Sequence, residues 1–395
     1  MLFAIRPSRR ALLAELSLAL SIPPHKSGNA VDHVLLDSTA GGGRISLKAT
    51  NFDESFESTF NAQVDVLGRV ALPTRKLHDY LRQLPDGDIT ISASEPHAII
   101  VRSGRSMTRF TGLDPDAFPS AKPVCEPIFH FQSEILAAVL RRTRFAISSE
   151  DSRYVLKCLL LSLGPEHTRL VSTDGNRLTL IEMPSASTES LSILIPRTGI
   201  DPLMALTGAA GANEIAVAVD DARICFSAGA RQLSTRRVVG NFPSYEAVLP
   251  TGQGRELTVE RQPLLDAVEH TVQFADSRKS AVKVQILENS LELSASSPEF
   301  GGASERIAVK FDGEPFAAAY NASFLCDFLR ATESSPRISI LFGDSRSAIE
   351  LRPAERGGPF TYRYVVMPAA TTDWLYQRFV CLLALLFRLD VRRTS

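Results

Sequence analysis

The sequence lacks the short motifs that mark most catalytic and metal-binding sites. Its seven histidines are scattered, and none stands in an HExxH arrangement or another spacing typical of zinc ligands. It contains no GxSxG, and the glycine run Gly41 to Gly43 lies between two strand-like stretches and is not followed by the Gly-Lys-Ser/Thr of a phosphate-binding loop. We therefore expect no catalytic residues, no metal and no cofactor.

Cysteine is scarce and unpatterned. There are five cysteines, an odd number without a CxxC pair, and Cys158, Cys225 and Cys326 lie within apolar runs. Such usage favours a reduced interior over a disulfide framework. The N-terminal MLFAIRPSRR lacks the long apolar stretch of a secretory signal. We expect a cytoplasmic protein.

An excess of charge of one sign is also missing. The net charge is −1, with 22% charged and 44% hydrophobic residues, which is ordinary for a globular protein. A nucleic-acid partner would therefore have to be recognised through the local distribution of charge. The 395 residues are enough for two or three domains, each with its own core.

An internal repeat organises the chain. The strand-to-helix junction at Pro73 recurs 123 positions later at Pro196, and more loosely after a further 125 positions at Asn321. A second string recurs in the same way, because Phe118-Pro119 and Phe242-Pro243 are 124 positions apart. This periodicity predicts three similar domains. We set them at 1–124, 125–251 and 252–370, followed by an apolar extension, 371–395.

Each repeat holds the same order of elements twice, a helix followed by strands. In 132–148, for example, Ile135, Leu136, Val139 and Leu140 recur at helical spacing. Alternating runs bounded by turn residues follow, as expected for antiparallel strands. The predicted fold class is α+β, with two helices and antiparallel sheets in each domain. The six predicted helices lie within 8–21, 74–84, 132–148, 192–208, 261–276 and 322–334.

Basic residues concentrate on or beside these helices, whereas acidic residues are spread through strands and loops. If the helices faced one side, that side would bind phosphate backbones without reading bases. The alternative is that the charges simply occupy solvated helix faces. The basic set comprises Arg9, Arg10, Arg75, Lys76, Arg82, Arg141, Arg142, Arg144, Arg197, Arg261 and Arg330.

Several ordered strings support a family assignment. They are VRSGRS (101–106), FP (118–119), DSRYVL (151–156), STDGNRL (172–178), IPR (195–197), NFPSYEAVLP (241–250) and YVVMP (364–368). With the threefold repeat, they make the chain resemble the bacterial sliding clamps, the β subunit of DNA polymerase III, over residues 1 to about 370. The resemblance implies a head-to-tail homodimer whose six domains form a ring around duplex DNA, conferring processivity on the polymerase without reading sequence or catalysing a reaction.

The resemblance also implies partners and sites. The polymerase III α subunit, the clamp loader, other polymerases and repair proteins would dock short peptides in one pocket, where Met367 is pliable and Thr173 or Arg177 satisfies peptide polar groups. Alternatively, Val365 to Pro368 form a terminal core strand. The implied pocket residues are Leu156, Thr173, Gly175, Asn176, Arg177, Leu178, Pro243, Ala247, Val248, Ser347, Val365, Val366, Met367 and Pro368.

The implied DNA contacts are His25, Lys26, Arg75, Glu150, Tyr154 and Val155. Two of these positions depart from the family pattern, because Glu150 introduces a carboxylate and Val155 replaces an aromatic residue. Ala247, at the pocket rim, stands where a basic residue is common. The implied dimer contacts are Met107 and Phe110 on an edge strand and Phe274 after a helix, although these residues could instead belong to the cores of their own domains.

The extension 371–395 has no counterpart in the family pattern. It is strongly apolar, yet too short and too closely flanked by arginine for a membrane span, so a membrane partner is not expected. Three hypotheses stay open: a helix packed on the third domain, a LLALLF string occupying the peptide pocket, or a membrane-surface anchor. For the whole chain, the alternative is a diverged relative that binds peptides without encircling DNA. An enzyme acting on nucleic acid is a more distant possibility.

Overall fold

The computed structural model describes residues 1–22, 29–119, 126–185, 190–209, 211–250, 254–275, 280–355 and 357–369. The chain divides into two compact units. Unit 1 comprises Met1–Leu140 and Ile195–Val238, and unit 2 comprises Arg141–Leu194 and Val239–Ser395. The central sequence repeat is therefore shared between the two units. The boundaries of the two compact units differ from the domain boundaries predicted from the repeat. Those domain boundaries stay a prediction.

Six α-helices occur in the described ranges, each inside a segment where the apolar spacing predicts one. They are α1 (Arg9–Ala19), α2 (Thr74–Gln83), α3 (Ser133–Thr143), α4 (Arg197–Thr207), α5 (Arg261–Val272) and α6 (Ala322–Ala331). The helix expected over 132–148 ends at Thr143 and is followed by a 3-10 turn, η3 (Arg144–Ala146). None of the described helices is long and apolar enough to cross a bilayer.

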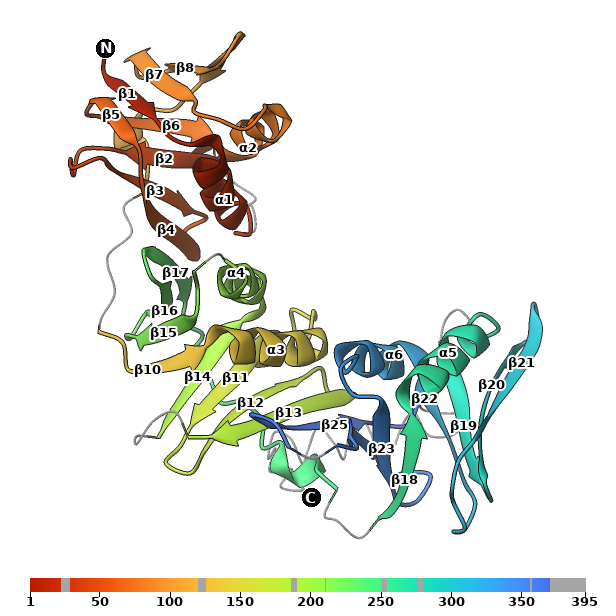
Figure 1. The fold of residues 1–395 in the computed structure, drawn as a ribbon. Coiled ribbons are helices and arrows are strands. Elements are labelled where there is room, and N and C mark those ends of the chain that lie inside the picture. The colour runs from red at the N-terminus through yellow and green to blue at the C-terminus, as the bar shows by residue number, and fades with distance from the viewer. Residues whose placement is uncertain are drawn as a thin grey trace, which may run out of the picture. The chain divides into compact units, whose positions relative to one another are not determined.

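Unit 1 contains two antiparallel sheets (Figure 1). The first has the order β5-β1-β7-β8-β9, with β1 (Phe3–Arg6), β5 (Gln63–Val66), β7 (Thr90–Glu95), β8 (Ala98–Ser103) and β9 (Ser106–Thr111). The second has the order β10-β15-β16-β17-β4-β3-β2-β6, with β2 (His33–Asp37), β3 (Arg44–Thr50), β4 (Glu54–Asn61), β6 (Arg69–Pro73), β10 (Phe129–Gln132), β15 (Glu214–Val219), β16 (Arg223–Ala228) and β17 (Arg231–Arg236). Because β17 pairs with β4, this sheet joins the first repeat to part of the central one.

Unit 2 follows the same plan. One sheet has the order β14-β11-β12-β13-β25-β24-β23-β18, with β11 (Cys158–Leu163), β12 (His167–Thr173), β13 (Arg177–Pro184), β14 (Leu191–Pro196), β18 (Arg255–Glu260), β23 (Arg337–Phe342), β24 (Ile349–Pro353) and β25 (Thr361–Val366). The other has the order β21-β20-β19-β22, with β19 (Ala281–Leu287), β20 (Ser290–Ser297), β21 (Gly301–Ala308) and β22 (Phe316–Asn321). Here β13 pairs with β25, so the larger sheet joins the central repeat to the third.

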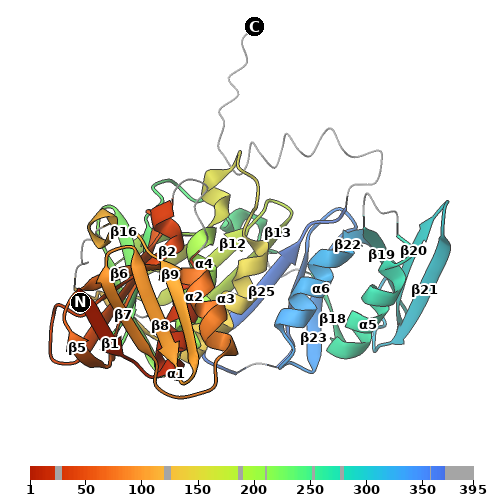
Figure 2. The ribbon, with the colours of Figure 1, turned by 90° about the horizontal axis from the view of Figure 1, so that it is seen from above.

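The helices of each unit cover the sheets with their apolar faces. In unit 1, Leu12 and Leu16 of α1 and Leu77 and Leu81 of α2 are fully buried, at the i, i+4 spacing that places side chains on one helix face. In unit 2, α5 and α6 lie side by side, and α5 packs on β20 and β21 (Figure 2). The predicted α+β class with two helices per repeat is confirmed.

One contact recurs between α1 and α2 and between α5 and α6. Nε of Arg9, the first residue of α1, donates to the carbonyl of Leu81 near the end of α2, at 2.9 Å. Nη1 of Arg261, the first residue of α5, donates to the carbonyl of Leu329 near the end of α6, at 3.2 Å. The internal repeat therefore extends from the order of elements to the contact that joins the helices.

Further 3-10 turns connect the elements, and the tight turn between β2 and β3 was correctly predicted. The 3-10 turns are η2 (Pro115–Ala117), η4 (Tyr154–Lys157) and η5 (Glu246–Val248), while η1 (Asn29–Asp32) leads into β2. The turn between β2 and β3 is made by Gly41, Gly42 and Gly43, with φ of 70°, 65° and 73°, a left-handed conformation that glycine adopts without steric cost. The sequence prediction of a hairpin at this glycine run is confirmed.

Candidate functional site

A groove opens in unit 2 where three segments distant in sequence meet. They are the turn between β12 and β13, the stretch around η5, and the end of β25. The empty volume of the groove is about 370 Å³, and it is open to solvent. Its lining residues are Thr173, Gly175, Asn176, Arg177, Leu178, Pro243, Tyr245, Val248, Val365 and Met367.

Strand register explains the apolar floor of this groove. Leu178 of β13 lies directly opposite Val365 of β25, and both are nearly fully buried. Since side chains alternate between the faces of a sheet, Leu178 and Val365 share one face, whereas Arg177 belongs to the other. The apolar character of the floor therefore follows from one pairing between two repeats.

The stretch 243–250 lies over the same face. Tyr245 is buried, and burial together with the neighbouring Glu246 carboxylate raises the pKa of its hydroxyl, against the opposing effect of Arg169. The carbonyl of Pro250 accepts a hydrogen bond from Nη2 of Arg363 at 3.4 Å. These contacts attach the stretch to the sheet, so that Val248 and Pro243 form a wall of the groove.

The turn at the other side of the groove satisfies its own polar groups. The Thr173 hydroxyl donates to the Arg177 carbonyl at 2.6 Å and accepts from the Gly175 amide at 3.1 Å. Oδ1 of Asp174 accepts from the amides of Asn176 and Arg177, at 2.9 and 3.1 Å. Gly175 has a φ of 91°, which favours glycine. Asp174 therefore caps the turn, as the sequence suggests for a TDG string.

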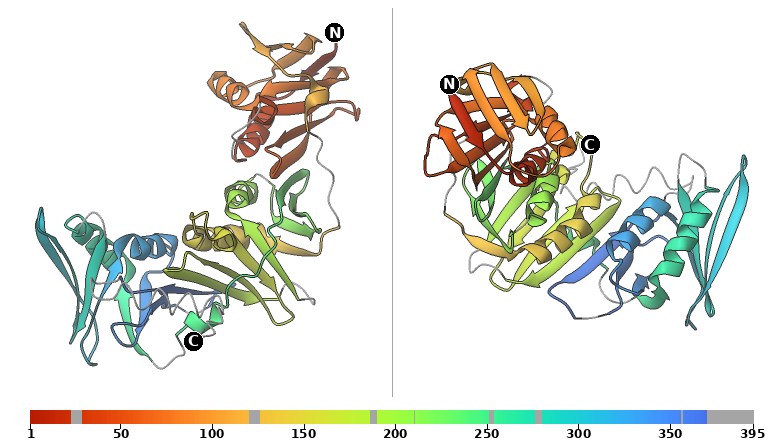
Figure 3. Two further views of the ribbon diagram at one scale, coloured as in Figure 1. Left: turned by 180° about the vertical axis from the view of Figure 1, so that it is seen from behind. Right: turned by 45° about the horizontal axis from the view of Figure 1, so that its top comes forward.

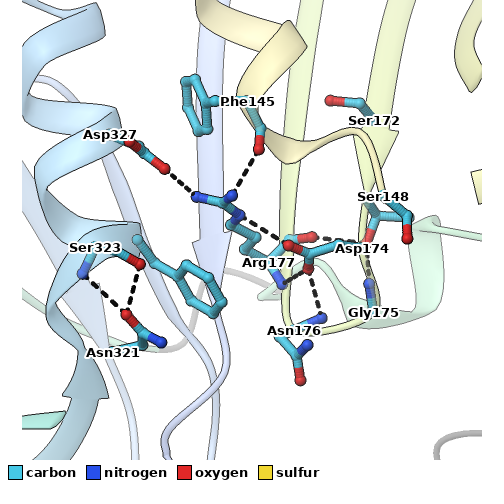
Figure 4. Close-up of polar contacts among 12 residues, drawn as sticks. Phe145, Ser148, Ser172, Asp174, Gly175, Asn176, Arg177, Asn321, Ser323 and Asp327 are labelled. Atoms are coloured by element: carbon cyan, nitrogen blue, oxygen red, sulfur yellow. Dashed lines mark hydrogen bonds and ion pairs between the residues drawn. The ribbon is translucent and has the colours of Figure 1, made fainter. Parts of the chain in front are cut away.

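Arg177 anchors this turn to α6 (Figure 4). Its Nε donates to Asp174 at 2.9 Å, its Nη1 to Asp327 at 2.6 Å, and its Nη2 to the Phe145 carbonyl at 2.6 Å. The guanidinium also lies over the Phe145 and Phe324 rings, with centroids at 5.3 and 4.3 Å.

The guanidinium stays charged in this setting. Burial by itself lowers the pKa of Arg177, but Tyr364, Asp327 and Asp174 outweigh that effect, and the pKa is raised above its ordinary value. Its Nε, Nη1 and Nη2 each donate one hydrogen bond within the protein, and Arg177 also lines the groove, so its contact with a bound peptide stays a prediction. These contacts give Arg177 a structural role in holding the turn that lines the groove.

The remaining predicted pocket residues are not among those that line the groove. Leu156 and Val366 are buried, Ala247 is exposed, and Ser347 and Pro368 are half-buried. The reverse case is Tyr245, which lines the groove although the sequence prediction left it out. The signal for it was available, since Tyr245 stands inside the NFPSYEAVLP string used for the family resemblance.

The predicted DNA contacts fall into different environments. His25 and Lys26 lie outside the described residues. Arg75 is exposed on α2, and Tyr154 in η4 is 58% exposed. Glu150 is exposed, with its carboxylate 4.0 Å from Nε of Arg153.

Val155, another predicted DNA contact, is largely buried. It is 7% exposed, and a methyl group there packs against the backbone of Gly240, so tightly that a Cβ on that glycine would lie 2.8 Å from it. Val155 therefore offers little surface, and its contact with DNA stays a prediction.

The predicted dimer contacts also differ in exposure. Met107 is 65% exposed on β9, at the edge of its sheet, and Phe274 is 36% exposed just after α5. Phe110 is only 8% exposed and packs edge-on against Tyr80, at a centroid distance of 5.8 Å. Phe110 is thus a core residue of unit 1, because its position on the strand directs it to the helix-covered face, opposite to Met107.

Comparison with known proteins identifies the family. Models of the DNA polymerase III beta subunit match in chain order: its N-terminal domain at residues 1–122, its central domain at 130–244 and its C-terminal domain at 246–370. The chain belongs to this family. The beta sliding clamp of Caulobacter vibrioides is 30% identical over 372 residues, covering 91% of this chain and 98% of the relative. That of Synechococcus elongatus is 28% identical over 368 residues, covering 90% and 96%.

Solved structures of sliding clamps have the same fold as this chain. The sliding clamp of Bartonella birtlesii, determined bound to griselimycin, has a TM-score of 0.85 at 27% identity, covering 93% of this chain and 100% of that one. The beta subunit of Thermotoga maritima has a TM-score of 0.86 at 24% identity, with coverage of 93% and 100%, and supports the fold. Sliding clamps of this family are processivity factors and not catalysts, and each chain provides three clamp domains, half of a ring. The family match ends at residue 370, before the apolar extension.

Proposed function

We propose that two copies of this chain close into a ring around duplex DNA and hold the replicative polymerase there through the groove of unit 2. A ring is retained on DNA by topology, so its contacts can be weak and independent of sequence. Tethering a polymerase to such a ring raises the effective concentration of the enzyme at the primer end. The observation on which the proposal rests is the groove itself, at the place where the family resemblance puts the partner site.

The groove suits a short apolar peptide. Leu178, Val365, Val248 and Pro243 provide aliphatic walls, and Met367 is a flexible side chain that adapts to a bulky anchor. The polar groups of the turn are already bonded within the protein. Recognition then depends on apolar anchor residues of the partner peptide. The same groove could bind such anchors from the polymerase α subunit, the clamp loader, other polymerases and repair proteins. The griselimycin complex of the Bartonella birtlesii clamp supports a ligand-binding surface in such proteins.

The helices provide a subset of their basic residues for DNA. Arg75, Lys76 and Arg82 of α2 are exposed, as are Arg141 and Arg197. Exposed basic side chains can approach phosphates through water, without fixed hydrogen bonds to the DNA.

Other basic residues serve within the fold. Arg9 and Arg261 join helix pairs, and Arg330 is bonded to Glu269 at 2.7 Å. The DNA-facing set is therefore smaller than the set of basic helix residues in the sequence. Tyr154, His25 and Lys26 complete the proposed DNA contacts, and Glu150 would weaken them locally.

The ring would close where two sheet edges meet. β9 is an edge strand of unit 1, and β21 is an edge strand of unit 2 (Figure 3). Edge strands present unpaired N–H and C=O groups that a second chain can complete. Pairing β9 of one copy with β21 of the other, with Met107 and Phe274 contributing apolar surface, would give two equivalent joints. We place this assembly in the cytoplasm.

Retention on DNA tests the encirclement. The protein would be loaded with its cognate clamp loader onto a nicked circular plasmid, and half of the sample would then be linearised. We expect a dimer by light scattering, retention on the circle and loss from the linear ends. Equal retention on both forms would contradict a ring and favour the alternative, a peptide-binding relative that does not encircle DNA.

Peptide binding tests the groove. The affinity of a fluorescein-labelled peptide containing adjacent Leu and Phe would be measured by anisotropy. We expect Val248→Glu, in the groove wall, to weaken binding at least tenfold, because it puts a charge in an apolar site. Val239→Glu is the matched control, since Val239 is 77% exposed, precedes the same stretch and does not line the groove. Equal affinities of the two variants would remove the groove as the partner site.

A further inference from the structure

We infer that the extension 371–395 binds in the groove of its own chain and competes with partner peptides. This inference rests on the proposed function of the groove. The extension lies outside the described residues, and its sequence and the described surface beside Ala369 support the inference.

The described chain ends beside the groove. Met367 lines it, and the Met367 amide donates to the carbonyl of Asn176, another lining residue, at 2.9 Å. Two residues later the amide of Ala369 donates to the carbonyl of Ala319 in β22, at 2.7 Å. An extended chain advances by roughly 3.3 Å per residue, so the stretch from Ala369 to Leu382 can span about 40 Å. The length of chain is more than enough to turn back to a wall two residues away.

The extension has the composition of a ligand for that groove. It contains the string Leu-Leu-Ala-Leu-Leu-Phe at 382–387, flanked by Arg378 and Arg388. Large apolar side chains are more stable when buried than in water, which favours docking on an apolar surface. The exposed Glu246 in η5, at the rim of the groove, complements the flanking arginines. The large apolar residues of the extension are Trp374, Leu375, Phe379, Val380, Leu382, Leu383, Leu385, Leu386, Phe387 and Leu389.

The neighbouring sheet of unit 2 provides a poorer surface. Its one face is covered by α5. On the other face, cross-strand neighbours are polar, with Lys283 opposite Ser294 and Gln285 opposite Glu292. An apolar segment gains little by covering such a face, because it would desolvate polar groups without partners. This disfavours the alternative in which the extension packs on the third domain.

Attachment in the same chain makes a weak interaction effective. A tethered segment reaches an effective concentration on the order of 1 mM, so an intrinsic Kd of about 0.1 mM would fill roughly 90% of the grooves. A partner peptide would then bind about tenfold more weakly than to an empty groove. The extension would thus set a threshold that favours partners with high affinity or with a second contact on the ring.

The test compares the full chain with a chain ending at Ala370, using the Leu-Phe peptide. We expect the truncation to tighten binding about tenfold and the full-length double variant Leu386→Ser, Phe387→Ser to do the same. Trp374→Ser with Leu375→Ser, outside the 382–387 string, is the matched control and should bind as the unaltered chain does. A synthetic peptide of residues 378–391, added to the truncated chain, should displace the labelled peptide, and Val248→Glu should abolish its binding.

The outcomes separate this inference from the proposed function. If the full and truncated chains bind the labelled peptide equally, self-occupation is overturned while the groove stands. If neither chain binds it, the groove proposal fails, and the inference fails with it. If truncation alters binding to phosphatidylglycerol vesicles, or the melting temperature, and leaves peptide affinity unchanged, the extension is a membrane anchor or a packed helix, and self-occupation is again overturned.

Discussion

Arg177 donates a 2.6 Å hydrogen bond to Asp327, and this bond joins a turn of the central repeat to α6 of the third repeat. Only 11% of the Arg177 side chain is exposed, compared with 33% for Asp327. A buried guanidinium that is paired with two carboxylates holds them in place, because removing it leaves the carboxylates without compensation. The Arg177–Asp327 contact therefore fixes the turn that forms one wall of the groove.

Replacing Arg177 should measure the strength of this connection. We expect Arg177→Ala to lower the free energy of unfolding by about 3 kcal/mol, because Asp174 and Asp327 lose their partner. Arg330→Ala is the control, because Arg330 lies on α6, the helix that also carries Asp327. Its pair with Glu269 is 62% exposed on the arginine side and should contribute less than about 1 kcal/mol. Urea unfolding of both variants checks the prediction, which would be refuted by equal losses.

The buried hydroxyl of Tyr320 predicts a neutral or stabilising substitution. Among the described residues it has no hydrogen-bond partner, although the residue is fully buried. An unsatisfied buried hydroxyl costs about 1–3 kcal/mol, so Tyr320→Phe should keep or raise the melting temperature. The matched variant Tyr364→Phe removes a hydroxyl that donates to the Phe324 carbonyl at 3.0 Å, and it should cost about 1 kcal/mol. A clear loss of stability in Tyr320→Phe would indicate a partner for this hydroxyl.

Buried tyrosines also predict a loss of stability at high pH. Burial raises the pKa of Tyr320, Tyr362 and Tyr364 above the ordinary value of 10.0. Above the unfolded-state pKa, the unfolded chain releases protons that the folded chain retains, so the free energy of unfolding is constant near neutral pH and falls as the pH rises past about 10.

The slope at high pH gives the measurement. Each buried tyrosine should contribute up to about 1.4 kcal/mol per pH unit between pH 10 and its folded-state pKa. Denaturant unfolding of the unaltered chain and of Tyr320→Phe from pH 8 to 11.5 should give a shallower decline in the variant. Parallel declines would show that Tyr320 ionises equally in both states.

Within unit 1, a buried ion pair should stabilise the junction of β17 and α1. Arg231 donates to Glu15 through Nη2 at 2.7 Å and through Nε at 3.1 Å, and Glu15 is 5% exposed. We expect Glu15→Gln to lower the free energy of unfolding by about 2–4 kcal/mol, because the Arg231 charge loses its compensation. Glu57→Gln, which breaks the exposed Lys48–Glu57 pair, is the control and should cost less than about 1 kcal/mol. Similar losses in both variants would show that the Glu15 pair does not depend on its burial.

The helices and turns could be predicted from the sequence because they depend on residues that are neighbours in the chain. The spacing of Leu12 and Leu16 predicts a helix without reference to any distant residue, and it is α1. The glycine run 41–43 and the TDG string at 173–175 predict tight turns for the same reason, since backbone conformation at a turn depends on the residues that form it. The repeat, read from the recurrence of Pro73 and Pro196, then extends this local information to the order of the elements.

The candidate site could be predicted from the sequence only in part, because it depends on contacts between segments that are distant in the chain. The sequence places Arg177 and Leu178 side by side, but the pairing of β13 with β25 decides that Leu178 floors the groove while the Arg177 guanidinium reaches α6. Val155 was expected at the DNA-binding surface, and Phe110 either at the dimer interface or in the core of its own domain. Both are buried, with Gly240 beside Val155 and Tyr80 against Phe110.

The sequence by itself determined the threefold repeat, the six helices and the family, because each is expressed in residue types and spacings along one stretch of chain. Only the tertiary structure decided that the central repeat is shared between two compact units, through the pairings of β17 with β4 and of β13 with β25. The physical reason is that a strand edge can pair with any compatible strand. Which one it meets depends on how the apolar faces of the whole chain are buried together.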